Sequence, residues 1–186
     1  MSRATRLAKH IERTVTGPMW HGPALLDVLK GVACDQALAR PLADAHTIWE
    51  LVLHITAWCN IARQRLTGEA TGDPTPEQDW PTVPIPGSDP NCGSDPPSDA
   101  ASAWCRAVER LAESHRQLAA DTRLLGDEHL DALVPELKYT VSVLLHGIVE
   151  HGTYHGGQIA LLRKAATDIG ADRGRSSGGA GAAPTV

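Results

Sequence analysis

Apolar residues recur every three or four positions along four long stretches of the chain, a spacing that places them on one face of an α-helix. The stretches cover about residues 2–15, 47–67, 98–120 and 139–169. No stretch shows the strict alternation of apolar and polar residues that is typical of a half-buried strand. The pattern therefore predicts an all-α protein that folds as an antiparallel four-helix bundle.

The second long stretch has the clearest ends. Thr47 and Glu50 have the spacing of a capping box at its start, and Gly68 is a typical residue just past a helix C-terminus. Its apolar stripe consists of Leu51, His54, Trp58 and Ile61. Because His54 belongs to this stripe, we expect its imidazole to point into the core.

The other segments are shorter or irregular. Residues 22–32 form a short apolar stretch after Gly17 and Pro18, so we expect a kinked arm at the N-terminus. Residues 69–97 hold eight of the thirteen prolines and a repeated GSDP unit, which predicts a long loop without helix. The residues that we expect to pack this loop onto the protein are Trp80 and Val83. Residues 1–170 are predicted to form one domain, and residues 171–186 a disordered low-complexity tail.

Composition excludes several classes of protein. The chain has seventeen Lys and Arg against twenty-two Asp and Glu, and the basic residues do not cluster. We therefore expect no nucleic-acid partner. No apolar run is long enough to cross a membrane, and the start of the chain has no signal-peptide pattern, so we expect a cytoplasmic protein. The four cysteines include no CxxC pair. We expect Cys59 and Cys105 to be buried in helices, and Cys92 to lie in the loop.

The fourth long stretch carries the most informative pattern, LLHGIVEHGTYHGGQIALLRKA. His151 and His155 lie four residues apart, so both imidazoles project from one face of a helix and can hold one metal ion. Gly147, one turn earlier, leaves space beside them. With His54 from a second helix, they form a three-nitrogen set with open positions, as in catalytic zinc sites. The alternative is that all three are core histidines without a metal.

Other histidines and motifs fit less well. His115 is the reserve ligand, although a core position suits it better. The pair reads HGTYH and lacks the glutamate of HExxH, and no ExxH motif supplies ligands for a di-iron site. Haem between His54 and His115 would leave HGTYH without a role. We expect Gly152 and Gly156 to serve close contacts between helices or subunits.

Two segments, TIWELVLHITAWCNIARQRLTGE and HGIVEHGTYHGGQIALLRK, resemble the DinB-like metalloprotein family. The segments WHGPALLDVLKGV and DWP resemble one branch of it, and the likeness extends over about residues 20–164. This family shares its fold with S-transferases that use the small thiols bacillithiol or mycothiol. The resemblance implies an antiparallel four-helix bundle, usually a homodimer. It also implies a nickel or zinc ion held by His54, His151 and His155.

The resemblance and the histidine pattern together suggest a metal-dependent S-transferase that joins a low-molecular-weight thiol to a small electrophile. Tyr154 and Gln158 are candidates to orient or protonate the substrate, and His21, Trp58 and Trp80 are candidates to line its cavity. Two alternatives stay open at this point. One is a metal-dependent hydrolase, and the other is a metal-binding stress-response protein without turnover.

Overall fold

The computed structural model describes residues 1–84 and 100–176, with side chains up to residue 167. Its helices are α1 (Arg3–Thr16), α2 (Leu25–Leu29), α3 (Cys34–Leu38), α4 (Ile48–Thr67), α5 (Pro76–Asp79), α6 (Ala100–Leu124) and α7 (Val141–Ser176), with a 3-10 helix, η1 (Asp127–Asp131), before α7. None of the described residues forms a strand of a sheet, which confirms the predicted all-α class.

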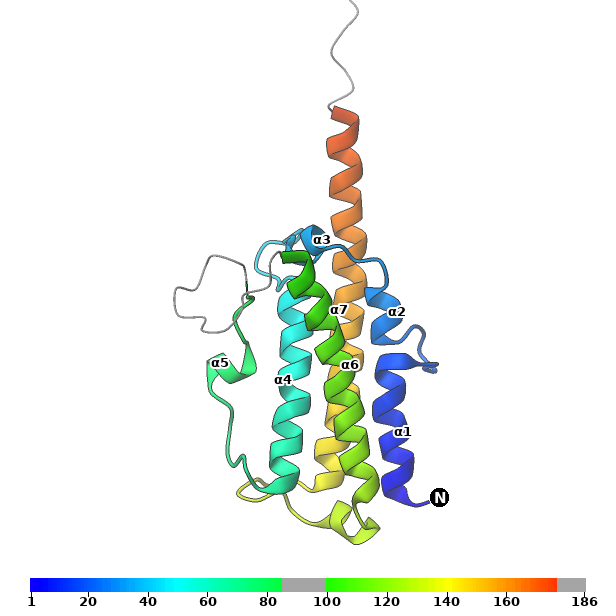
Figure 1. Ribbon diagram of the computed structural model, residues 1–186, viewed down its shortest axis with the longest axis vertical. Helices are drawn as coiled ribbons and strands as arrows, with labels where there is room; N and C mark the ends of the chain where they lie inside the picture. Colours follow the sequence, from blue (N-terminus) through cyan, green and yellow to red (C-terminus); the bar gives the residue numbers. More distant parts are fainter. Residues whose placement is uncertain (85–99, 177–186) are drawn as a thin grey trace, which may run out of the picture.

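The four long helices pack side by side (Figure 1). α1 contacts α6 and α7, and α4 contacts the same two helices from the other side. In Figure 1, α1 and α7 run in one direction, whereas α4 and α6 both run in the opposite direction. The expectation of an antiparallel order is therefore wrong for α4 and α6, which are consecutive long helices that lie parallel.

This parallel pair explains the long connection between α4 and α6. A helix of 20 residues is about 30 Å long, so the chain has to return over that distance before α6 can begin. This connection contains the one-turn helix α5, so the prediction that it has no helix is wrong at these residues. Thr75 caps α5, since its hydroxyl accepts a hydrogen bond from the Gln78 amide, and Pro76 is the first residue of the helix, where proline is favoured. The GSDP repeat and Cys92 lie outside the described residues.

The helix ends follow local chemistry with some differences from expectation. The predicted capping box is present, since Thr47 Oγ1 accepts from the Glu50 amide and Glu50 Oε2 accepts from the Thr47 amide. The expected helix over residues 22–32 shortens to α2, because Gly31 adopts a positive φ of 78°. α7 continues to Ser176, past the expected domain boundary at residue 170, since no proline interrupts it there. Residues 177–186, most of the predicted tail, lie outside the described residues.

The buried side chains form two clusters, one toward each end of the long helices. The first centres on Trp49 and Trp104, whose ring centroids are 5.5 Å apart, and the second on Ile11, Leu118 and Leu145. Cys59 belongs to the second cluster, as expected. Cys105 is exposed, so its expected burial is wrong: it follows Trp104, which takes the inward-facing position on α6.

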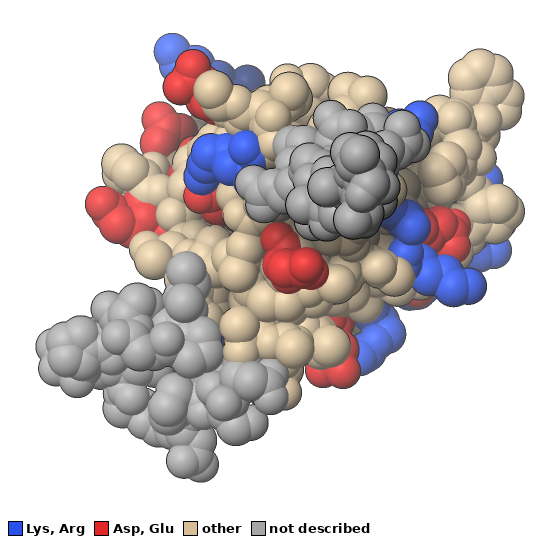
Figure 2. All heavy atoms as spheres, turned by 90° about the horizontal axis from the view of Figure 1, so that it is seen from above, with Lys and Arg blue, Asp and Glu red and all other residues tan. Residues whose placement is uncertain are grey.

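The molecular surface carries both signs of charge. Lys and Arg alternate with Asp and Glu on the face seen in Figure 2. Among the described helices, none combines the length and the apolar composition that crossing a bilayer requires.

Glycines in α7 allow other helices to approach closely. A Cβ atom at Gly152 would lie 2.8 Å from Thr14 Cγ2 of α1, and one at Gly156 would lie 3.2 Å from Leu25 Cδ2 of α2. Both distances are shorter than ordinary van der Waals contact between carbons. These two glycines therefore serve helix–helix contact, as the sequence suggested.

We predict that Gly152→Ala lowers the free energy of unfolding by about 1–2 kcal/mol, because overpacking against Thr14 outweighs the gain in helix propensity. The matched control is Gly157→Ala on the same helix, where an added Cβ meets no atom within 4 Å. This control should raise stability by about 0.5–1 kcal/mol. Urea unfolding of both variants gives the two values, and equal effects would contradict the proposed close packing.

Candidate metal centre

Three imidazoles from two helices meet where α4 and α7 pack together. His54 comes from α4, and His151 and His155 come from α7, which packs directly against α4. Their candidate ligand nitrogens all lie within 4.8 Å of one another, and His54 Nε2 is 2.9 Å from His151 Nε2. His54 and His155 are buried and His151 is half-buried. The structure therefore brings together the three residues that the sequence selected.

Hydrogen bonds fix the ring of His54. Its Nδ1 lies 2.7 Å from the backbone carbonyl oxygen of Asp79, which can only accept, so Nδ1 carries the proton. The neutral ring then presents the lone pair of Nε2 to His151. The Asp79 carboxylate lies 3.2 Å from the same Nδ1 and accepts a hydrogen bond of 2.6 Å from Trp58 Nε1. Asp79 thus holds both His54 and Trp58 in place.

A second hydrogen bond orients His155. Its Nδ1 donates to Gln158 Oε1 over 2.6 Å, one turn further along α7. The proton on Nδ1 leaves the Nε2 lone pair of a neutral His155 available. Gln158, a candidate for substrate contact in the sequence, therefore lies against a candidate metal ligand. Such supporting contacts raise the basicity of a ligating histidine and fix its tautomer.

Trp80 covers one face of the His54 ring. Its ring stacks on His54 with centroids 3.8 Å apart and an interplanar angle of 4°. Its other face stacks on His46 with centroids 3.6 Å apart and an angle of 10°. The indole is therefore held between two imidazoles, which closes one side of the histidine group to water. This agrees with the expectation that the first half of the connection packs onto the protein.

Burial keeps the three imidazoles uncharged. It lowers the pKa of His151 to about 3, with a smaller effect of the neighbouring imidazoles. Burial also lowers the pKa of His54, against the opposing effect of Asp79, and the pKa of His155, against its hydrogen bond to Gln158. All three are neutral near pH 7, so their lone pairs are ready for a cation.

A small cavity lies beside His151. It has a volume of about 260 Å³, and its walls include Trp58, Gly147, Ile148 and His151. An added Cβ at Gly147 would meet no atom within 4 Å, which confirms that this glycine leaves space next to the imidazoles. Trp58 is near this space, with its ring centroid 5.8 Å from that of His151.

The candidates His21 and Tyr154 are not part of the group of three histidines. His21 is exposed and lines a separate cavity of about 200 Å³ with Gly152 and Gly156, on another face of α7, so the structure does not bring it to the three histidines. Tyr154 is 65% exposed, and its ring centroid is 5.0 Å from that of His155. It therefore borders the group from outside.

His115, the reserve ligand, faces the core. It is 1% exposed, its Nδ1 donates to the Leu111 carbonyl over 2.9 Å, and its ring contacts the sulfur of Cys59 at 3.4–3.5 Å. It does not belong to the group of side chains that can share a metal ion. The structure thus gives His115 the packing role that its apolar seam suggested.

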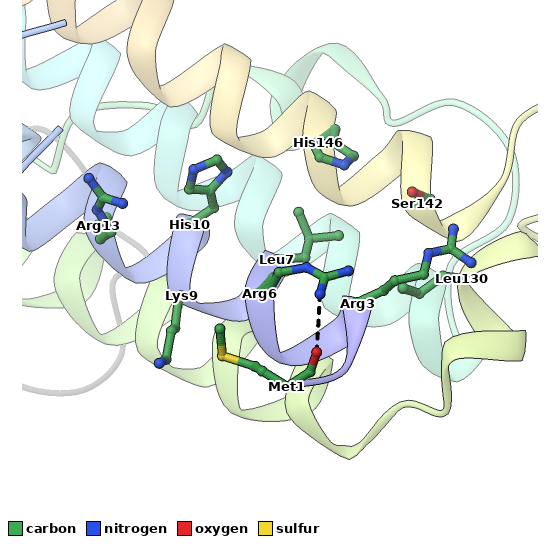
Figure 3. Close-up of a pocket in the computed structure, with 10 residues that line it drawn as sticks. All are labelled: Met1, Arg3, Arg6, Leu7, Lys9, His10, Arg13, Leu130, Ser142 and His146. Atoms are coloured by element: carbon green, nitrogen blue, oxygen red, sulfur yellow. Dashed lines mark hydrogen bonds between the residues drawn. The ribbon is translucent and has the colours of Figure 1, made fainter. Parts of the chain in front are cut away.

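A larger groove lies between α1 and the first half of α7 (Figure 3). It has a volume of about 530 Å³ and shares no residue with the three histidines. The charged or titratable side chains around it are Arg3, Arg6, Lys9, His10, Arg13 and His146. His10 and His146 therefore belong to this groove and not to the candidate metal centre.

Sequence reasoning missed two contributions. Asp79 was not singled out, although the DWP pattern that contains it was part of the family resemblance. The stacking of Trp80 between His46 and His54 depends on how the irregular connection folds back, and no periodicity signals such a contact. Both residues come from the segment around α5, so the connection between α4 and α6 helps to build the site.

The fold and the site define an all-α protein in which three histidines form a group that can hold a divalent metal ion. The family model of the DinB superfamily matches residues 20–159. The chain therefore belongs to the DinB superfamily, as its sequence patterns indicated. Comparison with curated proteins and with solved structures gives no match.

We predict a pH-dependent contribution of His115 to stability. Burial lowers its pKa from 6.5 to about 4, so above pH 6.5 it is neutral in both folded and unfolded chains. As the pH falls from about 6.5 to about 4, the unfolded chain gains a proton that the folded chain excludes, which costs on the order of 3 kcal/mol.

The measurement is urea unfolding of chelator-treated protein across that pH range. His115→Asn keeps a donor for the Leu111 carbonyl but cannot titrate, so its stability should fall less steeply with acid than that of the wild type. Parallel curves for the two proteins would show that His115 is protonated when folded.

Proposed function

We propose that this protein binds zinc or nickel through His54, His151 and His155 within a bundle of its four long helices, and acts as a thiol S-transferase on a small electrophile. One observation carries the metal site. Two ring nitrogens are tied to oxygen acceptors at Asp79 and Gln158, so the lone pairs on the opposite side of these rings are free to converge.

The donor set fits such an ion. Imidazole nitrogens suit zinc and nickel, and two of them on one ion at about 2.0–2.1 Å lie roughly 3 Å apart. The 2.9 Å between His54 Nε2 and His151 Nε2 agrees with that spacing. When bound, the metal would act as a Lewis acid that stabilises the anion of a thiol or of water near neutral pH. Three protein ligands leave room for such a group.

The surrounding residues have separable tasks in this proposal. Asp79 and Gln158 keep the rings of His54 and His155 oriented. Trp80 excludes water from one side, and Trp58 forms a wall of the cavity where the substrate would lie. Tyr154, at the outer edge of the group, is a candidate to orient a substrate.

Two observations favour the transferase over its rivals. A hydrolase needs a general base near the attacking water. The Asp79 carboxylate lies near the histidines, but it is occupied by Trp58 Nε1 and faces Nδ1 of His54, away from Nε2. A metal-binding stress-response protein without turnover has no need of a substrate space, whereas here a mostly apolar cavity borders His151.

The cytoplasmic location and the homodimer expected from the sequence also stand as proposals. Tyr154 and Leu161, seven residues apart on α7, are each 65% exposed, and such an apolar face suits contact with a second copy.

We predict that the full chain, purified without an affinity tag or chelator, contains about one zinc or nickel ion per chain. His54→Ala and His151→Ala should lose it, because two imidazoles retain a metal far less tightly than three. The matched control is His146→Ala, which removes an exposed histidine of the same helix. Elemental analysis gives the ratio. If the wild type is metal-free and cannot be reloaded, the proposed metal site is wrong and the three histidines are core residues.

Turnover then distinguishes the activities. Metal-loaded wild type should consume small electrophiles only when a low-molecular-weight thiol is present, and His151→Ala should be inactive. Turnover without any thiol would support the hydrolase instead.

A further inference from the structure

Arg65, near the end of α4, is a buried cation. It is 4% exposed, and no ion pair joins it to any carboxylate among the described residues. Its neighbour Arg63 shows the usual solution, with Nε 2.7 Å from Asp121 Oδ2. A buried charge that lacks a counter-ion costs several kcal/mol, so the position of Arg65 calls for an explanation.

Within the part of the chain that the structure describes, Arg65 contacts uncharged groups. Nη1 donates to the Tyr139 hydroxyl and Nη2 to the Gly72 carbonyl, each over 2.8 Å. The guanidinium also lies over the Trp58 ring, 5.5 Å from its centroid. Its buried Nε has no hydrogen-bond partner among the described residues. Neutral contacts position the cation but leave its charge uncompensated.

Arg65 and Tyr139 line the same cavity that reaches His151. The remaining walls are mostly apolar: Trp58, Val143, Leu144, Gly147 and Ile148. Since the oxygen of Tyr139 already accepts from Arg65, its own O–H can donate to a further acceptor. Polarisation by the cation strengthens that donor. The cavity thus offers a positive, hydrogen-bonding end and an imidazole end, separated by apolar walls.

We propose that this cavity is a subsite for a small carboxylate. The carboxylate would bind at the Arg65 and Tyr139 end, and a short apolar body would extend toward the three histidines. A carboxylate supplies the missing negative charge and accepts from both Arg65 and the Tyr139 hydroxyl. At about 260 Å³, the cavity is below the roughly 300–1,000 Å³ of most ligand sites, which favours a molecule of few atoms.

This assignment rests on the proposed function, because it treats the cavity as the place of one of the two substrates. It also narrows the class of substrate, since one of the two substrates then carries a carboxylate at the end remote from its reacting atom. Whether the thiol or the electrophile carries the acid is resolved by testing each partner with and without a carboxylate.

The test compares hexanoate with hexanamide, which has nearly the same shape but no charge. Calorimetric titration of the full chain should show hexanoate binding at least about tenfold more tightly, as a charge-assisted hydrogen bond outweighs a neutral one. Arg65→Met removes the cation and keeps an unbranched apolar chain, so it should abolish the preference. Tyr139→Phe removes one hydroxyl and should weaken hexanoate binding severalfold. This second variant keeps the test decisive if Arg65→Met fails to fold.

The titrations are run on zinc-loaded and on chelator-treated protein, since a carboxylate could also bind a metal directly. A preference for hexanoate in both forms, lost in Arg65→Met, supports the subsite. Three results would overturn the subsite. The first is equal binding of hexanoate and hexanamide, and the second is no binding of either probe in the millimolar range. The third is a preference for hexanoate that needs zinc and survives in Arg65→Met. The metal content of the same samples is measured independently, so failure of the metal site is distinguished from failure of the subsite.

Discussion

The structure depends on three neutral imidazoles that converge on one point. His54 and His155 are buried and His151 is half-buried, and this burial lowers the pKa of each ring, so the repulsion of three positive charges does not arise. Hydrogen bonds then commit one nitrogen of His54 and one of His155 to oxygen acceptors. The Nε2 lone pairs of these two rings are then available on the side where His151 Nε2 lies 2.9 Å from His54 Nε2, an arrangement that a divalent cation would stabilise.

The long helices position that centre through two different faces of α7. One face presents His151 and His155 to α4, and another carries Gly152 and Gly156 against α1 and α2. Side chains at those two glycines would push α7 away from its neighbours. Because α4 and α6 run parallel, the chain between them has to return along α4 before α6 can begin. Asp79 and Trp80 belong to this return, so the connection closes the site as well as linking two helices.

Much of this could be predicted from the sequence, for identifiable physical reasons. Helical periodicity and a spacing of four residues place His151 and His155 on one face, and the stripe of α4 turns His54 inward. The direction of α6 is not encoded in any local pattern, since an amphipathic helix buries the same face when reversed. Asp79 and Trp80 act through contacts that depend on the path of an irregular segment. Arg65 looked like an ordinary basic residue at a helix C-terminus, and only its burial sets it apart.

X-ray absorption at the zinc edge of the reconstituted full chain tests the central claim most directly. We expect nitrogen or oxygen neighbours at about 2.0–2.1 Å, with the multiple scattering that imidazole rings produce, whereas His155→Ala should retain little zinc after the same reconstitution. A sulfur neighbour at about 2.3 Å, or a spectrum that His155→Ala leaves unchanged, would place the metal elsewhere and contradict the three-histidine centre.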